Sequence, residues 1–95
     1  MNKIPAQILL TDEEGTERWV VNINSITEEQ LKADGITKYS FKEDIQSELE
    51  WISNMLEWSE DLRSEVVQFA LLYMKRHPEL SPAQAMSMGY NEWVK

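Results

Sequence analysis

Two short runs near the start of the chain have the residue composition of β-strands. They are residues 6–11 (AQILLT) and residues 16–23 (TERWVVNI), and an acidic stretch followed by Gly15 joins them. Because glycine takes positive φ angles without a steric penalty, Gly15 suits the end of a tight turn. The two runs therefore predict a β-hairpin.

The second run of this hairpin has two chemically different faces. Successive strand residues point to opposite sides of a sheet, so Trp19, Val21 and Ile23 share one face. The other face carries Arg18, Val20 and Asn22. We expect the more apolar face, that of Trp19, to meet a core. A two-stranded hairpin is marginal in water, so it must lie against helices, recruit a third strand or pair with another chain.

A short helix is expected after the hairpin. Thr27 and Gln30 have the spacing of a capping box, in which the threonine hydroxyl accepts from the Gln30 amide and the glutamine side chain reaches back. The helix should begin at Thr27 and end at Gly35, which suits the left-handed position after a helix. The β-branched and aromatic character of residues 36–39 is compatible with a brief third strand.

The next segment has the 3.6-residue periodicity of a helix. Ser40 and Glu43 form a second capping-box pattern, and a helix over residues 42–58 is expected to follow. Ser59, followed by two acidic residues, predicts a break and a new helix start. One apolar stripe of the helix over residues 42–58 has the narrow width of a core face and consists of Ile45, Leu49, Ile52 and Leu56.

Two more helices are expected toward the end of the chain. Apolar residues nearly encircle residues 62–74, so this helix should be either the buried centre of the domain or a helix shared in a dimer. Ser81, with Pro82 behind it and Gln84 three residues on, predicts a further helix start. Gly89 permits a close backbone approach, and we expect the last helix to dock onto residues 62–74.

These elements predict a single α+β domain over residues 1–95. Residues 1–39 form a β-hairpin, a short helix and a possible third strand, and residues 40–95 form a three-helix part. Ninety-five residues with 42% apolar content suffice for one hydrophobic core but not for two. No motif in the chain is specific enough to assign a family.

Net charge and cysteine content narrow the classes of function. A formal net charge of −8 opposes binding to nucleic acid or to anionic membranes and favours a protein partner with a basic surface. The absence of cysteine excludes disulfides and fits a reducing compartment. No signal peptide and no stretch of the roughly 18 apolar residues that span a membrane is found, so we expect a cytoplasmic protein.

Enzyme chemistry has little support in the sequence. His77, the only histidine, lies at a predicted helix end, where the helix dipole accounts for it. One histidine and no cysteine make a transition-metal site implausible. The three glycines stand apart and form no phosphate-binding loop. We therefore expect a non-enzymatic protein without a metal or other cofactor.

The most suggestive pattern lies in the middle of the chain and is both acidic and aromatic. Residues 43–65 hold eight acidic residues against one base. On the predicted helix, Trp51, Met55 and Trp58 form a second stripe beside the core stripe. The residues that we predict to bind a protein, here called the acidic–aromatic face, are Trp51, Met55 and Trp58 with Glu43, Asp44, Glu48, Glu50 and Glu57.

The acidic–aromatic face has a plain structural interpretation beside the functional one. Tryptophan and methionine at helical spacing usually pack inside a protein, so the wide apolar arc can simply contact two neighbouring elements. The acidic residues can equally form a solvated helix surface. Exposure of the tryptophans distinguishes the two interpretations, and the sequence does not determine it.

The first functional hypothesis is a protein-binding module, an inhibitor or adaptor, with the tryptophans as anchors and the acids at the rim. Small acidic domains without catalytic motifs are common among phage and mobile-element products that capture a host protein. A second is an acidic mimic of nucleic acid that blocks the basic groove of a nucleic-acid-binding enzyme. Its glutamates at seven-residue spacing would lie about 10.5 Å apart along a helix, which is wider than the phosphates of one strand. A third is a self-associating domain that uses residues 62–74 or the hairpin edge.

Overall fold

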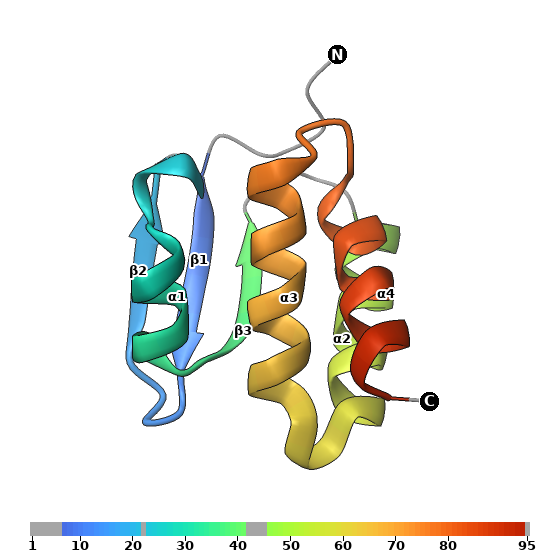
Figure 1. Ribbon diagram of the computed structural model, residues 1–95. Helices are drawn as coiled ribbons and strands as arrows, with labels where there is room; N and C mark the ends of the chain where they lie inside the picture. Colours follow the sequence, from blue (N-terminus) through green and yellow to red (C-terminus); the bar gives the residue numbers. More distant parts are fainter. Residues whose placement is uncertain (1–6, 22, 42–45, 95) are drawn as a thin grey trace.

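A computed structural model describes residues 7–21, 23–41 and 46–94 of the chain. It has the predicted α+β architecture, with a small antiparallel sheet followed by a helical part (Figure 1). The elements in chain order are β1 (Ile8–Asp12), β2 (Glu17–Val20), the 3-10 turn η1 (Ile23–Ser25), α1 (Glu28–Asp34), β3 (Ile36–Phe41), α2 (Gln46–Ser59), the 3-10 turn η2 (Glu60–Leu62), α3 (Arg63–Arg76) and α4 (Pro82–Trp93).

The predicted hairpin and third strand are confirmed. β1 is the central strand of the sheet, and it pairs antiparallel with β2 on one side and with β3 on the other. The turn between β1 and β2 is closed by the Asp12 carboxylate, which accepts from the backbone amides of Glu14 (2.9 Å) and Thr16 (3.0 Å). Gly15 has the expected positive φ, 85°. The hairpin thus recruits its third strand from the same chain.

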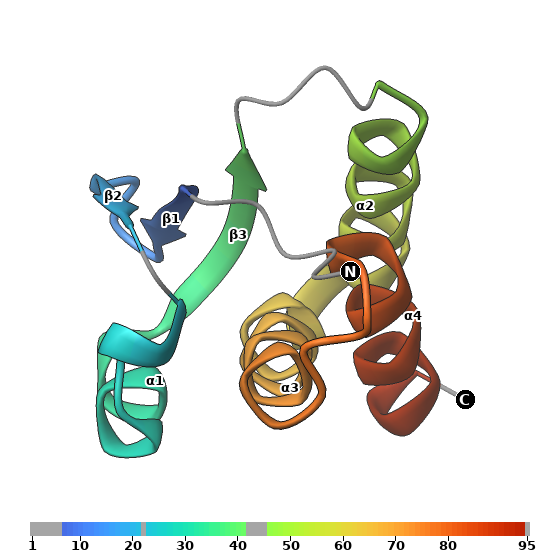
Figure 2. The ribbon, with the colours of Figure 1, turned by 90° about the horizontal axis from the view of Figure 1, so that it is seen from above.

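The predicted inward face of β2 is wrong. Val20 is buried, whereas Trp19 is 44% and Val21 69% exposed. α1 and α3 cover one side of the sheet (Figure 2). Val20 pairs with the buried Ile8 and faces this side, so Trp19, the preceding strand residue, points to the other side. Ile23 is buried as expected, but it reaches the core from the turn η1 and not from the strand.

The capping box at Thr27 is confirmed, and the one at Ser40 is not. Thr27 accepts from the Gln30 amide at 3.1 Å, and the Gln30 side chain accepts from the Thr27 amide at 2.9 Å. Gly35 then ends α1 with φ 61°. Ser40, in contrast, lies within β3 opposite Leu9, because strand pairing continues to Phe41. The rest of that predicted helix start falls outside the described residues.

The break between α2 and α3 occurs at Ser59, but the serine does not cap the next helix. Its hydroxyl donates to the carbonyl of Met55, one turn back in α2, at 2.6 Å. A serine that bonds backward in this way competes with the helix ladder and often bends the helix. Glu60 follows with φ 51°, a left-handed conformation that ends α2 and leads into η2.

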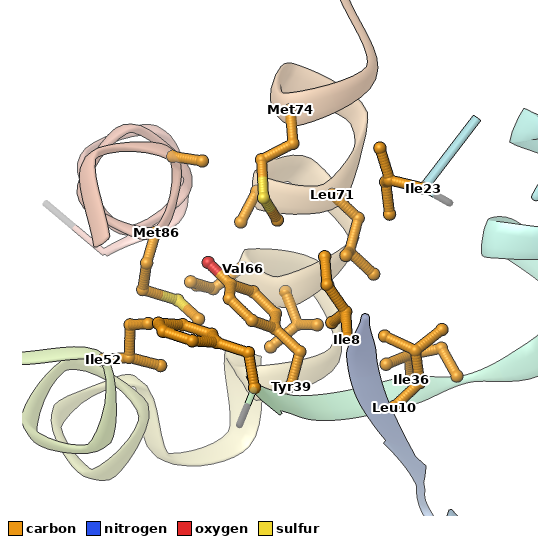
Figure 3. Close-up of a cluster of buried hydrophobic side chains, with 14 of the residues drawn as sticks. Ile8, Leu10, Ile23, Ile36, Tyr39, Ile52, Val66, Leu71, Met74 and Met86 are labelled. Atoms are coloured by element: carbon orange, nitrogen blue, oxygen red, sulfur yellow. The ribbon is translucent and has the colours of Figure 1, made fainter. Parts of the chain in front are cut away.

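α3 is the buried centre of the molecule. Val66, Val67, Ala70, Leu71 and Met74 are fully buried, between the sheet on one side and α4 on the other. Side chains of β1, β3, α2, α3 and α4 meet in this core (Figure 3). Neighbours within its own chain thus bury these five residues of α3, while Phe69, Leu72 and Tyr73 are partly buried.

The last helix docks onto α3 as predicted. Ser81 and Gln84 form the expected capping box, and Pro82 is the first residue of α4. A Cβ atom at Gly89 would lie 2.5 Å from the carbonyl oxygen of Val66, so the two backbones are in close contact there. The buried Tyr39 hydroxyl donates to the Pro82 carbonyl at 2.6 Å, which ties β3 to the start of α4. Within the described residues, no helix is both long and apolar enough to cross a membrane.

Candidate functional site

The three apolar members of the acidic–aromatic face differ in their exposure. Met55 is 2% exposed and belongs to the core, whereas Trp51 is 46% and Trp58 50% exposed. Trp51 and Trp58 are seven residues apart and therefore lie almost directly above one another along α2. Two large aromatic side chains thus stand side by side at the surface, with Met55 beneath them.

α4 positions these side chains from the neighbouring helix. α2 and α4 lie beside each other in both views (Figures 1 and 2). The indole Nε1–H of Trp51 donates to the Ser87 hydroxyl at 3.1 Å, and the Ser87 hydroxyl donates to the thioether sulfur of Met55 at 3.4 Å. One serine of α4 therefore links the exposed tryptophan to the buried methionine.

Aromatic contacts continue this arrangement. The rings of Trp51 and Trp58 are 5.9 Å apart and nearly perpendicular, with an interplanar angle of 87°. The ring of Trp58 also meets that of Tyr90, at 6.3 Å and 66°. Edge-to-face pairs of this kind are favourable because the positive edge of one ring meets the negative face of another. Trp51 is therefore held by its hydrogen bond to Ser87 and Trp58 by its ring contacts with Trp51 and Tyr90.

These residues enclose a small cavity that opens to the surface between the two helices. Its volume is about 220 Å³, and its lining residues are Trp51, Met55, Trp58, Ser87, Tyr90 and Asn91. We call it the α2–α4 pocket. Its lining is mostly apolar, and its polar groups are two indole N–H groups, a hydroxyl, a phenol and an amide. Such a lining can bind a ligand group. The Ser87 hydroxyl donates to the Met55 thioether and not to a base, so this hydrogen bond does not activate it as a nucleophile.

Two of the five predicted acids lie on the exposed surface of α2 outside the lining of this pocket, and the side chains of the other three are outside what the structure describes. Glu50 and Glu57 are exposed, and each directly precedes one of the tryptophans, so that each is about 100° from its tryptophan around the helix. Glu43 and Asp44 fall outside the described residues, as does the side chain of Glu48. The acidic ridge of Glu50 and Glu57 therefore runs along the side of α2.

Among the described residues, the other titratable groups do not assemble into a second site. His77 is exposed, and its Nδ1 lies 3.5 Å from a carboxylate oxygen of Glu79. Arg76 and Glu28 form an exposed ion pair at 3.1 Å that joins α3 to α1. In the described part of the chain, no three or more histidine or acidic side chains come together as they would to hold a metal ion.

Sequence reasoning did not assign the α4 half of the pocket to the site. Ser87, Tyr90 and Asn91 share one helix face by their spacing of three and four residues, which was the available signal. That spacing does not tell which helix this face meets. α4 meets α2 because the chain turns back after α2 and again after α3. A tertiary contact of this kind cannot be predicted from the residue pattern of one helix.

No protein-family model, curated protein or solved structure matches the chain.

Proposed function

We propose that the protein is a non-enzymatic protein-binding module, an inhibitor or adaptor that binds a basic partner through the α2–α4 pocket and the adjoining acidic ridge. The exposure of Trp51 and Trp58 is the observation that carries this proposal. Two neighbouring apolar side chains that are both half exposed have an unfavourable solvation free energy in the free protein. Large exposed aromatic side chains are enriched at interaction sites.

The fixed positions of the two tryptophans also support a binding role. Association normally costs about 0.5–1.5 kcal/mol for each flexible side chain that becomes immobile. The hydrogen bond from Trp51 to Ser87 and the ring contact between Trp58 and Tyr90 restrict both side chains before any partner arrives. A partner would therefore meet an arranged aromatic surface.

Replacing both tryptophans by serine tests the proposal. Because the side chains are about half exposed, the folded structure should persist, and partner affinity should fall about thirtyfold or more, as it does at interface hot spots. The measurement is affinity capture from cell lysate with mass spectrometry, at low and high salt, followed by a titration with the purified partner. Circular dichroism reports the fold of each variant.

Trp19→Ser is the matched control. Trp19 is 44% exposed, close to the value of Trp51, but it lies on β2, on the side of the sheet that faces away from α1 and α3. It should bind the partner like the unaltered protein. Equal loss of partner in this control, or full retention of partner by the Trp51→Ser/Trp58→Ser variant, would contradict the proposed binding surface.

A further inference from the structure

The size of the α2–α4 pocket restricts what can enter it. Its volume of about 220 Å³ is below the range of about 300–1,000 Å³ that is usual for sites of drug-sized ligands. A single side chain of a partner protein is of the right scale. The pocket opens at the surface between two helices, so a side chain that projects from a partner can reach it.

The walls of the pocket favour a cation. Trp51, Trp58 and Tyr90 contribute aromatic rings whose faces carry the negative part of the ring quadrupole. Met55 contributes a polarisable sulfur, which accepts from the Ser87 hydroxyl, and Asn91 contributes an uncharged amide. None of the six lining side chains is a base. The lining is therefore rich in aromatic rings and holds no positively charged side chain.

The surface around the pocket is negatively charged, which also favours a cation. Glu50 and Glu57 adjoin the tryptophans on α2, and the chain has a net charge of −8. A positively charged group is attracted at long range by this net charge and at short range by aromatic ring faces. Charge complementarity thus selects the kind of side chain that the pocket accepts.

We propose that the α2–α4 pocket binds the guanidinium group of an arginine side chain from a basic segment of the partner protein, an inference that rests on the proposed function for its biological setting. Arginine is favoured over lysine because the planar guanidinium is weakly hydrated and stacks on aromatic faces. A lysine ammonium holds its water more strongly and loses more on entering an apolar pocket.

A titration with small probes tests this inference directly. The peptides are blocked Gly-Gly-Xaa-Gly-Gly sequences in which Xaa is arginine, lysine or citrulline, the last being a neutral analogue of arginine with nearly the same shape. The indole N–H signals of the four tryptophans are followed by nuclear magnetic resonance in the full chain. Substitution of each tryptophan by phenylalanine in turn assigns its signal.

The arginine peptide should shift the signals of Trp51 and Trp58 in a saturable way and leave those of Trp19 and Trp93 in place. Its affinity should exceed that of the citrulline peptide about tenfold, which is the range of a partly desolvated cation–π contact. Equal affinity for arginine and citrulline, no saturable shift with arginine, or tighter binding of lysine would overturn the inference.

A second variant separates the ring face from mere apolar volume. Trp58→Leu keeps an apolar lining but removes one aromatic wall, so the preference for arginine over citrulline should fall severalfold while the protein stays folded. Trp19→Leu serves as the control and should keep the preference. An unchanged preference in Trp58→Leu would count against the cation–π contact.

The two proposals fail in different ways. If the captured partner depends on Trp51 and Trp58 while the arginine peptide does not bind, the binding surface stands and the arginine inference is wrong. If the arginine peptide binds at Trp51 and Trp58 but no partner depends on them, the pocket chemistry stands and the proposed function is wrong.

Discussion

Gly89 is the residue at which α3 and α4 come closest. A methyl group added there would meet the backbone carbonyl of Val66 at 2.5 Å, and the backbone amide of Ala70 and the Cβ of Phe69 also lie within 3.4 Å. Backbone atoms of a buried helix cannot turn aside as a flexible side chain can. The position therefore requires glycine for a steric reason, although its φ angle is an ordinary helical one.

Gly89→Ala should destabilise the protein. Alanine gains about 1 kcal/mol of helix propensity over glycine, but overpacking a core typically costs about 1–3 kcal/mol and here pushes two helices apart. Because the added methyl group would meet a backbone oxygen at 2.5 Å, we expect an overpacking cost of about 2–3 kcal/mol. The net fall in the free energy of unfolding should then be about 1–2 kcal/mol, measured by urea denaturation.

The control for this substitution is Met88→Ala, one position earlier in α4, where the side chain is 40% exposed. It should change the stability by less than the Gly89 variant, because no buried cavity forms. A Gly89→Ala protein more stable than the unaltered chain would show that α3 and α4 do not approach as closely as described.

At Trp51, Met55 and Trp58 the sequence predicted a common stripe but not its exposure. All three have the same helical spacing, and the same spacing occurs in core residues. Met55 is buried because Ser87 of α4 lies over it, whereas the tryptophans lie at the edge of that contact. A tertiary contact therefore decides which residue is core and which is surface.

At the scale of elements, local start signals predicted α1 and α4 well and failed where pairing over longer distances intervened. Thr27 and Ser81 both form their capping boxes. Ser40 has the same pattern of residues but pairs opposite Leu9 in β3. Strand pairing with β1 satisfies backbone groups that a helix start would leave open, so the tertiary contact overrides the local signal.

The capping box of α4 should contribute measurably to stability. Ser81→Ala removes the hydroxyl that accepts from the Gln84 amide at 3.2 Å, and loss of such a cap typically costs about 1 kcal/mol. Urea denaturation of the variant should show a decrease of this size. Ser53→Ala, at an exposed position within α2, is the control and should be neutral or slightly stabilising because alanine has the higher helix propensity. An equal cost at both positions would mean that the loss at Ser81 does not come from capping.

At the scale of the whole molecule, the sheet and the helices pack around one hydrophobic core. α1 and α3 cover one side of the sheet, and α2 and α4 extend this arrangement beyond β3 (Figure 2). The α+β class, the order of the elements and the docking of the last helix could all be predicted from periodicity and caps. The inward face of β2 could not, because it depends on which side of the sheet the helices cover.

The burial of α3 also bears on self-association. Its apolar circumference was the reason to consider a helix shared between two chains. β3 and α4 cover α3 within a single chain, so its composition requires no second copy. An interaction with another protein is better sought where large apolar side chains remain exposed and lie together, as Trp51 and Trp58 do on α2.

The acidic charge belongs to the whole molecule, yet its position on α2 should matter for binding. Replacing Glu50 and Glu57 by glutamine removes two charges beside the pocket, and replacing Glu13 and Glu14 by glutamine removes two at the exposed hairpin turn. The net charge changes equally in both variants.

If the ridge contacts the basic partner directly, affinity should fall about tenfold in the Glu50→Gln/Glu57→Gln variant, and the dependence of affinity on salt should become shallower. The turn variant should lose less, since charges farther than about 10 Å from the contact are largely screened at physiological salt. Association and dissociation rates measured at several salt concentrations separate the two effects, and equal losses in both variants would assign the acidic contribution to net charge alone.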